Sequence, residues 1–264
     1  MSEHESGQVP AAAAEIYEQS FIPALFGAWP PEVMAAAEVR AGQDILDVAC
    51  GTGILAREAK RAVGSEGSVT GVDINDGMLA VARKQSSEIS WHKSPAEDLP
   101  FQDASFDRVV SQFGLMFFQD KVKAISEMLR VLRPGGRIAV AVWASLGDTP
   151  GYAAVVELLT DLFGSDVAKA LEAPYSLGDT QALKSLFTEG GATQVSVQTV
   201  RGKARFASVE AWIYTDVKGW TLSDAIDDSQ YELLKRRAPQ HLAPFVLPDG
   251  SVEFSSPAHI ITAA

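Results

Sequence analysis

Short apolar runs and helical repeats alternate along the first two thirds of the chain. The apolar runs predict strands near residues 44–49, 68–73, 89–93, 106–112 and 136–143. The helical repeats predict helices near residues 53–63, 76–86, 120–131 and 151–164. Such alternation favours a mostly parallel sheet with helices on both faces. The segment Arg133-Pro-Gly-Gly136 is expected to separate one helix from the next strand.

The pattern is looser on both sides of this unit. From Ala11 to Phe26 apolar residues recur at roughly helical spacing, with Pro23 as a break, and Pro31 can open a second helix that reaches Val39. After Trp143 the chain predicts a helix near 179–190, a strand at 194–200, helices near 208–217 and 223–238, and a closing strand at 256–262.

The most informative segment is a glycine turn between a strand and a helix. The first predicted strand carries Asp47 near its end, and Gly51 and Gly53 follow before the helix begins. A second apolar run, Ser68–Asp73, ends in another acid. A strand, a glycine turn, a helix and an acid at the end of the next strand bind adenosine in many enzymes, because the acid accepts hydrogen bonds from the ribose hydroxyls.

Asp47 favours one cofactor over the others that use such a turn. A dinucleotide brings an anionic pyrophosphate, which a carboxylate four residues before Gly51 would repel. The methionine end of S-adenosylmethionine carries an ammonium and a sulfonium, and both are attracted to a nearby acid. The pattern therefore favours S-adenosylmethionine over a nicotinamide cofactor, and over a strand-turn-helix without any ligand.

Five segments resemble the class I S-adenosylmethionine-dependent methyltransferases of the type 11 group, which includes the ubiquinone and menaquinone C-methyltransferases. In chain order they are Leu46–Gly53, Gly71–Asn75, Ala96–Phe101, Ser105–Val110 and Leu129–Gly136. The resemblance implies a Rossmann-like sheet of seven strands, with an antiparallel last strand between the fifth and the sixth. It also implies that S-adenosylhomocysteine is the product.

The motifs and the resemblance together suggest the residues that bind the cofactor. Asp73 is expected to hold the ribose, with a helix N-cap as its alternative role, while Ile74 and Met78 either flank the adenine or belong to the core. The family's usual Asp-Ala pair is Pro95-Ala96 here, so Glu97 or Asp98 is a candidate replacement for the missing acid. The full predicted set is Asp47, Ala49, Gly51, Thr52, Gly53, Asp73, Ile74, Met78, Ala96, Glu97, Gln112 and Tyr17.

The acceptor side is less determined. The segment Ser111–Leu115 resembles the Ser-Phe-Gly-Leu stretch of the quinone C-methyltransferases, with Gln112 at the serine position. The candidate pocket residues, each of which could equally be structural, are Phe21, Phe113, Met116, Phe117, Phe118, Trp212 and His241. No residue stands out as a general base, and positioning alone supplies much of the rate of a transfer from a sulfonium. No carboxylate cluster has a metal-ligating spacing, so no metal is expected.

Four regions are expected along the chain. Residues 1–9 form a disordered tail, 10–40 an N-terminal helical lid, 41–204 with 251–264 the cofactor domain, and 205–250 a helical cap. The lid and cap carry aromatic residues that could cover the acceptor: Tyr17, Phe21, Trp212, Tyr214 and Trp220.

Composition limits the classes of molecule that the protein is expected to bind and indicates where it is found. The 264 residues carry a net charge of -12, which repels a nucleic-acid backbone. The N-terminus is polar and acidic rather than like a signal peptide, and no apolar run suggests a membrane segment, so a cytosolic protein is expected. The single cysteine, Cys50, cannot form an intramolecular disulfide.

The sequence predicts a methyltransferase acting on a small, partly apolar molecule, with a protein or nucleic-acid methyltransferase and a non-catalytic cofactor-binding module as alternatives. The oligomeric state stays open.

Overall fold

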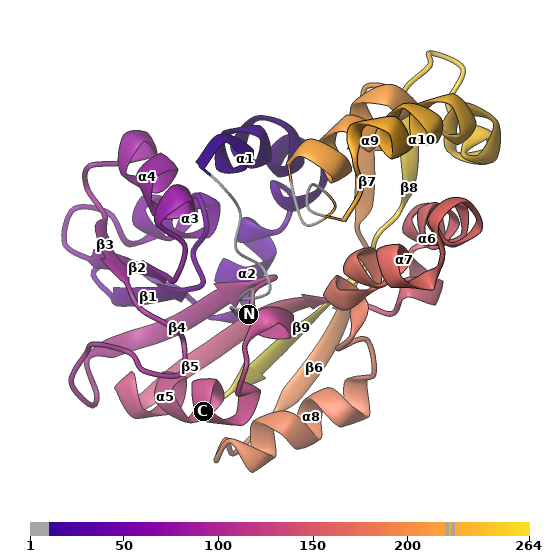
Figure 1. Cartoon of the computed structure of the whole chain (residues 1–264). Helices are drawn as coiled ribbons and strands as arrows, with labels where there is room; N and C mark the ends of the chain where they lie inside the picture. The colour runs from indigo at the N-terminus through magenta and orange to yellow at the C-terminus, as the bar shows by residue number, and fades with distance from the viewer. Residues whose placement is uncertain (1–10, 220–221, 223–224) are drawn as a thin grey trace, which may run out of the picture.

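The computed structural model describes residues 11–219, 222 and 225–264, so the predicted tail at 1–9 and Trp220 lie outside the described part. A seven-stranded sheet forms the centre of the molecule in the order β3-β2-β1-β4-β5-β9-β6 (Figure 1). Its strands are β1 Asp44–Val48, β2 Ser68–Asp73, β3 Ser90–Lys93, β4 Phe106–Gln112, β5 Leu132–Trp143, β6 Ser196–Val200 and β9 Ala258–Ala263. The first five strands are parallel, and β9 is antiparallel to both β5 and β6. The predicted fold class and the position of the last strand are confirmed.

Helices cover both faces of the sheet because its strands are apolar on both sides. The sheet-covering helices are α2 Pro30–Ala36, α3 Ile54–Val63, α4 Asp76–Gln85, α5 Lys121–Val131 and α8 Thr180–Glu189. Helix α2 packs on α3, and α5 packs on α8 (Figure 1). The central strand β5 shows the result, since residues 138–143 are all buried. Short 3-10 helices lie in the connections: η2 Leu115–Phe117, η3 Leu146–Asp148, η4 Ala173–Tyr175 and η6 Ala243–Phe245.

Two predictions about proline-containing segments are wrong. Strand β5 begins at Leu132, so Arg133–Gly136 belongs to the strand as a bulge instead of separating it from α5. The pairing of β4 with β5 shifts there, from Phe106 opposite Leu132 to Arg108 opposite Arg137. The extra residues on β5 loop out while the sheet continues.

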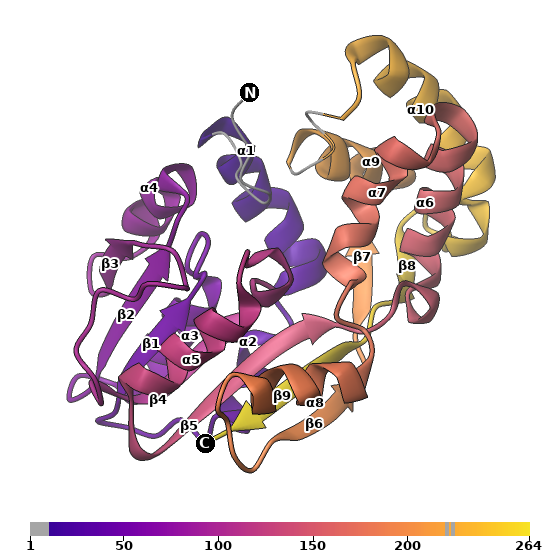
Figure 2. The ribbon, with the colours of Figure 1, turned by 60° about the horizontal axis from the view of Figure 1, so that its bottom comes forward.

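Pro23 does not break the N-terminal helix either. Helix α1, Ala11–Ile16, continues directly into the π-helix η1, Tyr17–Phe26, with Pro23 inside it. A proline ring in an α-helix collides with the carbonyl four residues earlier, and the wider π turn moves that carbonyl away. In both views the segment lies between α4 and the C-terminal helices (Figures 1 and 2).

The remaining elements form a cap beside the carboxyl end of β5. It contains α6 Pro150–Phe163, α7 Ser165–Glu172, α9 Val209–Lys218 and α10 Asp228–His241. Two short strands that the apolar pattern did not predict, β7 Lys203–Phe206 and β8 Val252–Ser255, pair antiparallel. In the chain, β7 precedes α9 and β8 follows α10. Five aromatic rings pack together at the centre of this region: Tyr152, Phe206, Trp212, Phe245 and Phe254.

Candidate active site

The glycine turn after β1 folds as its sequence suggests. Ala49, Gly51 and Gly53 all have positive φ angles, of 57°, 54° and 87°, a conformation that glycine adopts at least cost. A Cβ on Gly53 would also lie 2.5 Å from the ring of Trp91, so the turn is both left-handed and tightly packed. The turn leads directly into α3, and it places backbone N–H groups at the carboxyl end of the sheet.

Asp73 lies at the end of β2 and faces this turn. Its Oδ2 accepts a hydrogen bond from the Gly51 N–H at 2.8 Å, and its Oδ1 accepts one from the Asn75 N–H at 2.8 Å. Loss of hydration raises the pKa of the Asp73 carboxyl, and these backbone donors limit the rise. Asp73 is not the N-cap of α4, because Asn75 holds that position and accepts from the Met78 N–H.

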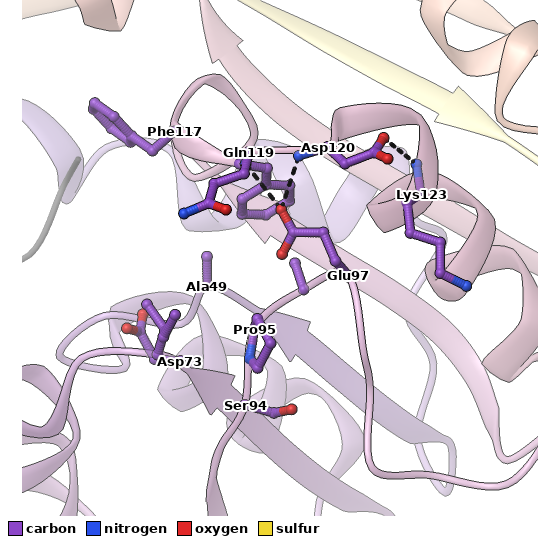
Figure 3. A pocket seen from close by; sticks show the side chains of 12 residues that line it. Ala49, Asp73, Ser94, Pro95, Glu97, Phe117, Gln119, Asp120 and Lys123 are labelled. Carbon is purple, nitrogen blue, oxygen red and sulfur yellow. Dashed lines mark hydrogen bonds between the residues drawn. The ribbon is translucent and has the colours of Figure 1, made fainter. Parts of the chain in front are cut away.

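A cavity of about 480 Å³ opens beside Asp73 (Figure 3). Its walls come from the turn and from the segments after β2, β3 and β4. The lining residues are Ala49, Asp73, Ile74, Ser94, Pro95, Ala96, Glu97, Phe117, Phe118, Gln119, Asp120 and Lys123. The sequence suggested seven of these as site residues, Phe118 among them; Ser94, Pro95, Gln119, Asp120 and Lys123 were not predicted. Their common signal is position, since all follow the carboxyl ends of β3 and β4.

Glu97 connects two walls of this cavity. Its Oε1 accepts hydrogen bonds from the backbone N–H groups of Gln119 at 2.9 Å and Asp120 at 3.2 Å. Figure 3 shows the Glu97 side chain reaching across to that segment. The carboxylate therefore orders the loop after β4 in addition to lining the cavity. The other candidate acid, Asp98, is exposed and does not line either cavity of the site.

A second, smaller cavity of about 30 Å³ lies on the other side of Ala49. Ala49 lines both cavities, so the two are adjacent across the turn. The smaller one is lined by Tyr17, Asp47, Ala49, Cys50, Gly51, Thr52, Ile54, Leu55 and Gln112. The structure thus brings Tyr17, from the N-terminal helix, together with the turn and with Gln112 at the end of β4.

Asp47 is the electrostatic centre of the smaller cavity. It is only 1% exposed, and neither of its carboxylate oxygens has a hydrogen-bond partner among the residues that the structure describes. Burial raises the pKa of Asp47 well above its usual range; the nearby backbone N–H of Ala56, which does not reach hydrogen-bond geometry, limits the rise, and the charge of Asp73 adds to it. A buried carboxylate without a partner is costly, so this arrangement fits a cationic ligand that would supply the missing partner.

The end of β4 is closely packed against both the turn and an aromatic cluster. A Cβ on Gly114 would lie 2.5 Å from the Cβ of Ala49, so only glycine permits this approach. Phe113 has a positive φ of 58°, and its ring stacks on Trp143 with centroids 3.7 Å apart. Phe26 and Trp29 from the N-terminal segment pack on the same pair of rings.

Several predicted residues do not line either cavity. Phe21, Phe113 and Met116 are buried in the core, and Met78 is buried on α4. Trp212 is fully buried in the aromatic cluster of the cap. His241, on α10, lies 3.8 Å from the carboxylate of Glu157 on α6. Of the predicted pocket residues, Phe117 and Phe118 line one of these cavities. Hydrophobic pattern alone cannot separate a pocket ring from a core ring, because both are apolar and share the same spacing.

The chain resembles known methyltransferases in sequence and in structure. The profile of the ubiE/COQ5 methyltransferase family matches residues 24–203. Demethylmenaquinone methyltransferase of Staphylococcus epidermidis is 35% identical over 188 residues, covering 66% of this chain and 78% of that protein. The Staphylococcus carnosus protein of the same name is 36% identical over the same shares.

Two solved structures share the fold. The YcgJ protein of Bacillus subtilis superposes with a TM-score of 0.59 at 20% identity, covering 90% of this chain and 97% of that one. Phosphoethanolamine N-methyltransferase 2 of Haemonchus contortus, solved with S-adenosyl-L-methionine, superposes with a TM-score of 0.58 at 18% identity. It covers 96% of this chain and 56% of that one. At these identities the likeness shows the fold.

The sheet order, the glycine turn and the acid at the end of β2 define a Rossmann-like methyltransferase. The chain belongs to the ubiE/COQ5 methyltransferase family, and it is an S-adenosylmethionine-dependent enzyme. This decides against the alternative of a non-catalytic cofactor-binding module. In the part of the chain that the structure describes, no helix combines the length and apolar character needed to cross a membrane. The same residues contain no group of three or more His, Cys, Asp or Glu side chains arranged to hold a metal ion.

Proposed function

We propose that the two cavities on either side of Ala49 hold S-adenosylmethionine, with its adenosine beside Asp73 and its methionine end beside Asp47. The pair of unpartnered Asp47 oxygens carries this proposal. A cationic methionine end would meet the buried carboxylate, while the ribose would lie within reach of Asp73. The shared lining by Ala49 supports a single ligand that spans both spaces.

Most of the other predicted cofactor residues also line the two cavities, although Gly53 and Met78 do not. Ile74 and Ala96 line the larger cavity on the expected adenine side, and Tyr17, Thr52 and Gln112 line the smaller one. When bound, S-adenosylmethionine supplies an electrophilic methyl group on a sulfonium. The chain's part is to hold that group in line with the acceptor and to keep water away from it.

The acceptor that we propose is a small, partly apolar molecule of the reduced quinone class, methylated on a ring carbon. The name of the Staphylococcus relatives, demethylmenaquinone methyltransferase, supports this class. The net charge of -12 disfavours a nucleic-acid substrate. In the transfer, the ring carbon forms a bond to the methyl carbon and the carbon–sulfur bond breaks. The displaced ring proton leaves, and S-adenosylhomocysteine is released.

A turnover assay tests the acceptor class. The full chain is incubated with methyl-labelled S-adenosylmethionine and a reduced naphthoquinone that has one unsubstituted ring position. The same compound in oxidised form, a mixed peptide and a DNA duplex serve as comparison acceptors. We expect label in the reduced quinone and an equal amount of S-adenosylhomocysteine. Label in the peptide or the DNA, or no transfer to any reduced quinone, would overturn the assignment of the acceptor.

A further inference from the structure

An ion pair links the N-terminal helix to the glycine turn. Glu18, on η1, accepts a hydrogen bond through Oε1 from Nη2 of Arg57 on α3, at 2.7 Å. The other guanidinium nitrogen of Arg57, Nη1, donates to the carbonyl oxygen of Thr52 in the turn, also at 2.7 Å. The side chains of Arg57 and Glu18 are only 16% and 14% exposed, so water screens this pair weakly.

The same helix is tied to the site a second time, near its other end. The Phe26 carbonyl oxygen accepts a hydrogen bond from Nε2 of Gln112 at 3.3 Å, and Gln112 ends β4. Next to Glu18, Tyr17 lines the smaller cavity, and its ring stacks on Phe26 with centroids 5.1 Å apart. The helix is therefore fixed to the turn on one side of the cavity and to the end of β4 on the other.

Each of these two contacts, Glu18 with Arg57 and Gln112 with Phe26, leaves a buried acceptor atom without a partner. Within the described part of the chain, Oε2 of Glu18 and Oε1 of Gln112 are buried and accept no hydrogen bond. A buried ion pair contributes little net stability, because desolvation offsets the attraction, and its best-attested use is to specify one arrangement. Because Arg57 also donates to the Thr52 carbonyl oxygen in the glycine turn, this ion pair is well placed to specify how the N-terminal helix lies against the turn.

We propose that Glu18 and Arg57 are positioning residues that hold the N-terminal helix, and with it Tyr17, against the methionine end of the cofactor. The proposal rests on the cofactor placement given above. Arg57 holds the turn from outside through Thr52, and Glu18 aligns the helix with Arg57. The pair touches neither the methyl group nor the acceptor, so it affects the reaction only through the helix and the turn.

Two variants separate positioning from stability. Arg57→Met leaves a buried Glu18 without its cation, and should lower both the melting temperature and the affinity for S-adenosylmethionine. Glu18→Gln/Arg57→Met removes both charges, so the melting temperature should largely recover. If the pair positions the helix, the cofactor affinity of the double variant should stay about tenfold weaker than that of the wild type, a typical coupling between neighbouring groups.

The chain contains a matched control on the same helix. Glu15 and Lys84 join α1 to α4 at 2.9 Å, but their side chains are 54% and 67% exposed. Glu15→Gln/Lys84→Met should leave the cofactor affinity within about twofold of the wild type, because exposed pairs contribute little.

Calorimetry and hydrogen exchange complete the test. In the cofactor-free protein, exchange at residues 14–26 should be faster in Glu18→Gln/Arg57→Met than in the wild type, while α5 is unchanged. A double variant with wild-type cofactor affinity and wild-type exchange would show that the pair is only structural. Failure of the wild type itself to bind S-adenosylmethionine would instead contradict the cofactor placement, and the exchange comparison would still report on the ion pair.

Discussion

Asp47 in the sheet domain and Asp216 in the cap have almost the same burial but different surroundings. Each is 1% exposed, and each has a raised carboxyl pKa because burial removes its hydration. Asp47 lines a cavity, and both its oxygens lack partners among the described residues. Asp216 lies in the aromatic cluster, where Oδ1 accepts a hydrogen bond from the Tyr152 hydroxyl at 3.1 Å.

The difference shows what makes a buried acid a candidate binding group. Burial raises the pKa of Asp216 to about 8, although the Tyr152 hydroxyl and the Trp212 indole limit the rise. Asp216 is therefore mostly a neutral carboxyl at pH 7, and it contributes to the packing of the cap. For Asp47 no side-chain donor limits the rise of the pKa, and only the backbone of Ala56 lowers it, but Asp47 does have adjacent space. A perturbed pKa alone would not have distinguished the two acids, whereas the cavity does.

The largest effect should come from the acid at the rim of the turn. We expect Asp73→Ala to weaken S-adenosylmethionine binding at least about tenfold, because in the proposed placement Asp73 accepts two charge-assisted hydrogen bonds from the ribose. Asp216→Asn should leave this affinity unchanged. Isothermal calorimetry with both variants, and circular dichroism to confirm folding, checks the prediction. An unchanged affinity of a folded Asp73→Ala protein would remove Asp73 from the site.

Asp47 should act through its charge. Asp47→Asn keeps the shape of the side chain but removes the anion that a bound cationic ligand would stabilise, so affinity for S-adenosylmethionine should fall about tenfold, the size of one charged hydrogen bond. Adenosine has no cationic methionine end, and its affinity should change much less. Competition binding with both ligands makes the comparison. Equal losses for the two would indicate a collapsed turn and would contradict the charge argument.

Asp216 should appear in the pH dependence of stability instead. Its pKa is about 8 in the folded protein, against an ordinary value of 3.8. Between these values the folded state keeps a proton that the unfolded state releases, so its contribution to the free energy of unfolding falls as pH rises and is lost above pH 8. Asp216→Asn should make that decline shallower. Urea unfolding from pH 5 to pH 9 measures it, and identical slopes would place the ionisation elsewhere.

The smallest effect concerns the proposed lid. If the N-terminal helix and the cap cover the acceptor, amide exchange in residues 11–28 and 208–219 should slow when S-adenosylmethionine is added. The measurement is mass spectrometry after deuterium labelling, with the glycine turn as a positive control. A response of the turn without any response of these two segments would show that the aromatic rings of the cap only pack it onto the sheet. Trp212 favours this alternative, because it is fully buried against Phe206 and Phe254.

The sequence by itself determined the sheet and the cofactor class. Apolar runs that end in Asp47 and Asp73, with Gly51 and Gly53 between them, are local features, and their meaning depends on spacing along the chain. Local spacing fixes strand, turn and helix because each forms from neighbouring residues. The position of the last strand between the fifth and the sixth followed from the resemblance, and the structure confirmed it.

Only the tertiary structure decided which residues meet across the chain. It joined Tyr17 to the turn, Glu18 to Arg57, and Glu97 to the backbone of Gln119 and Asp120. It also separated Trp212 and His241 from both cavities, and it continued the N-terminal helix through Pro23 as π turns. Such contacts depend on packing between segments that lie far apart in sequence, and no local pattern encodes them. An apolar ring has the same spacing whether it faces a pocket or a core, and only its neighbours in space distinguish the two.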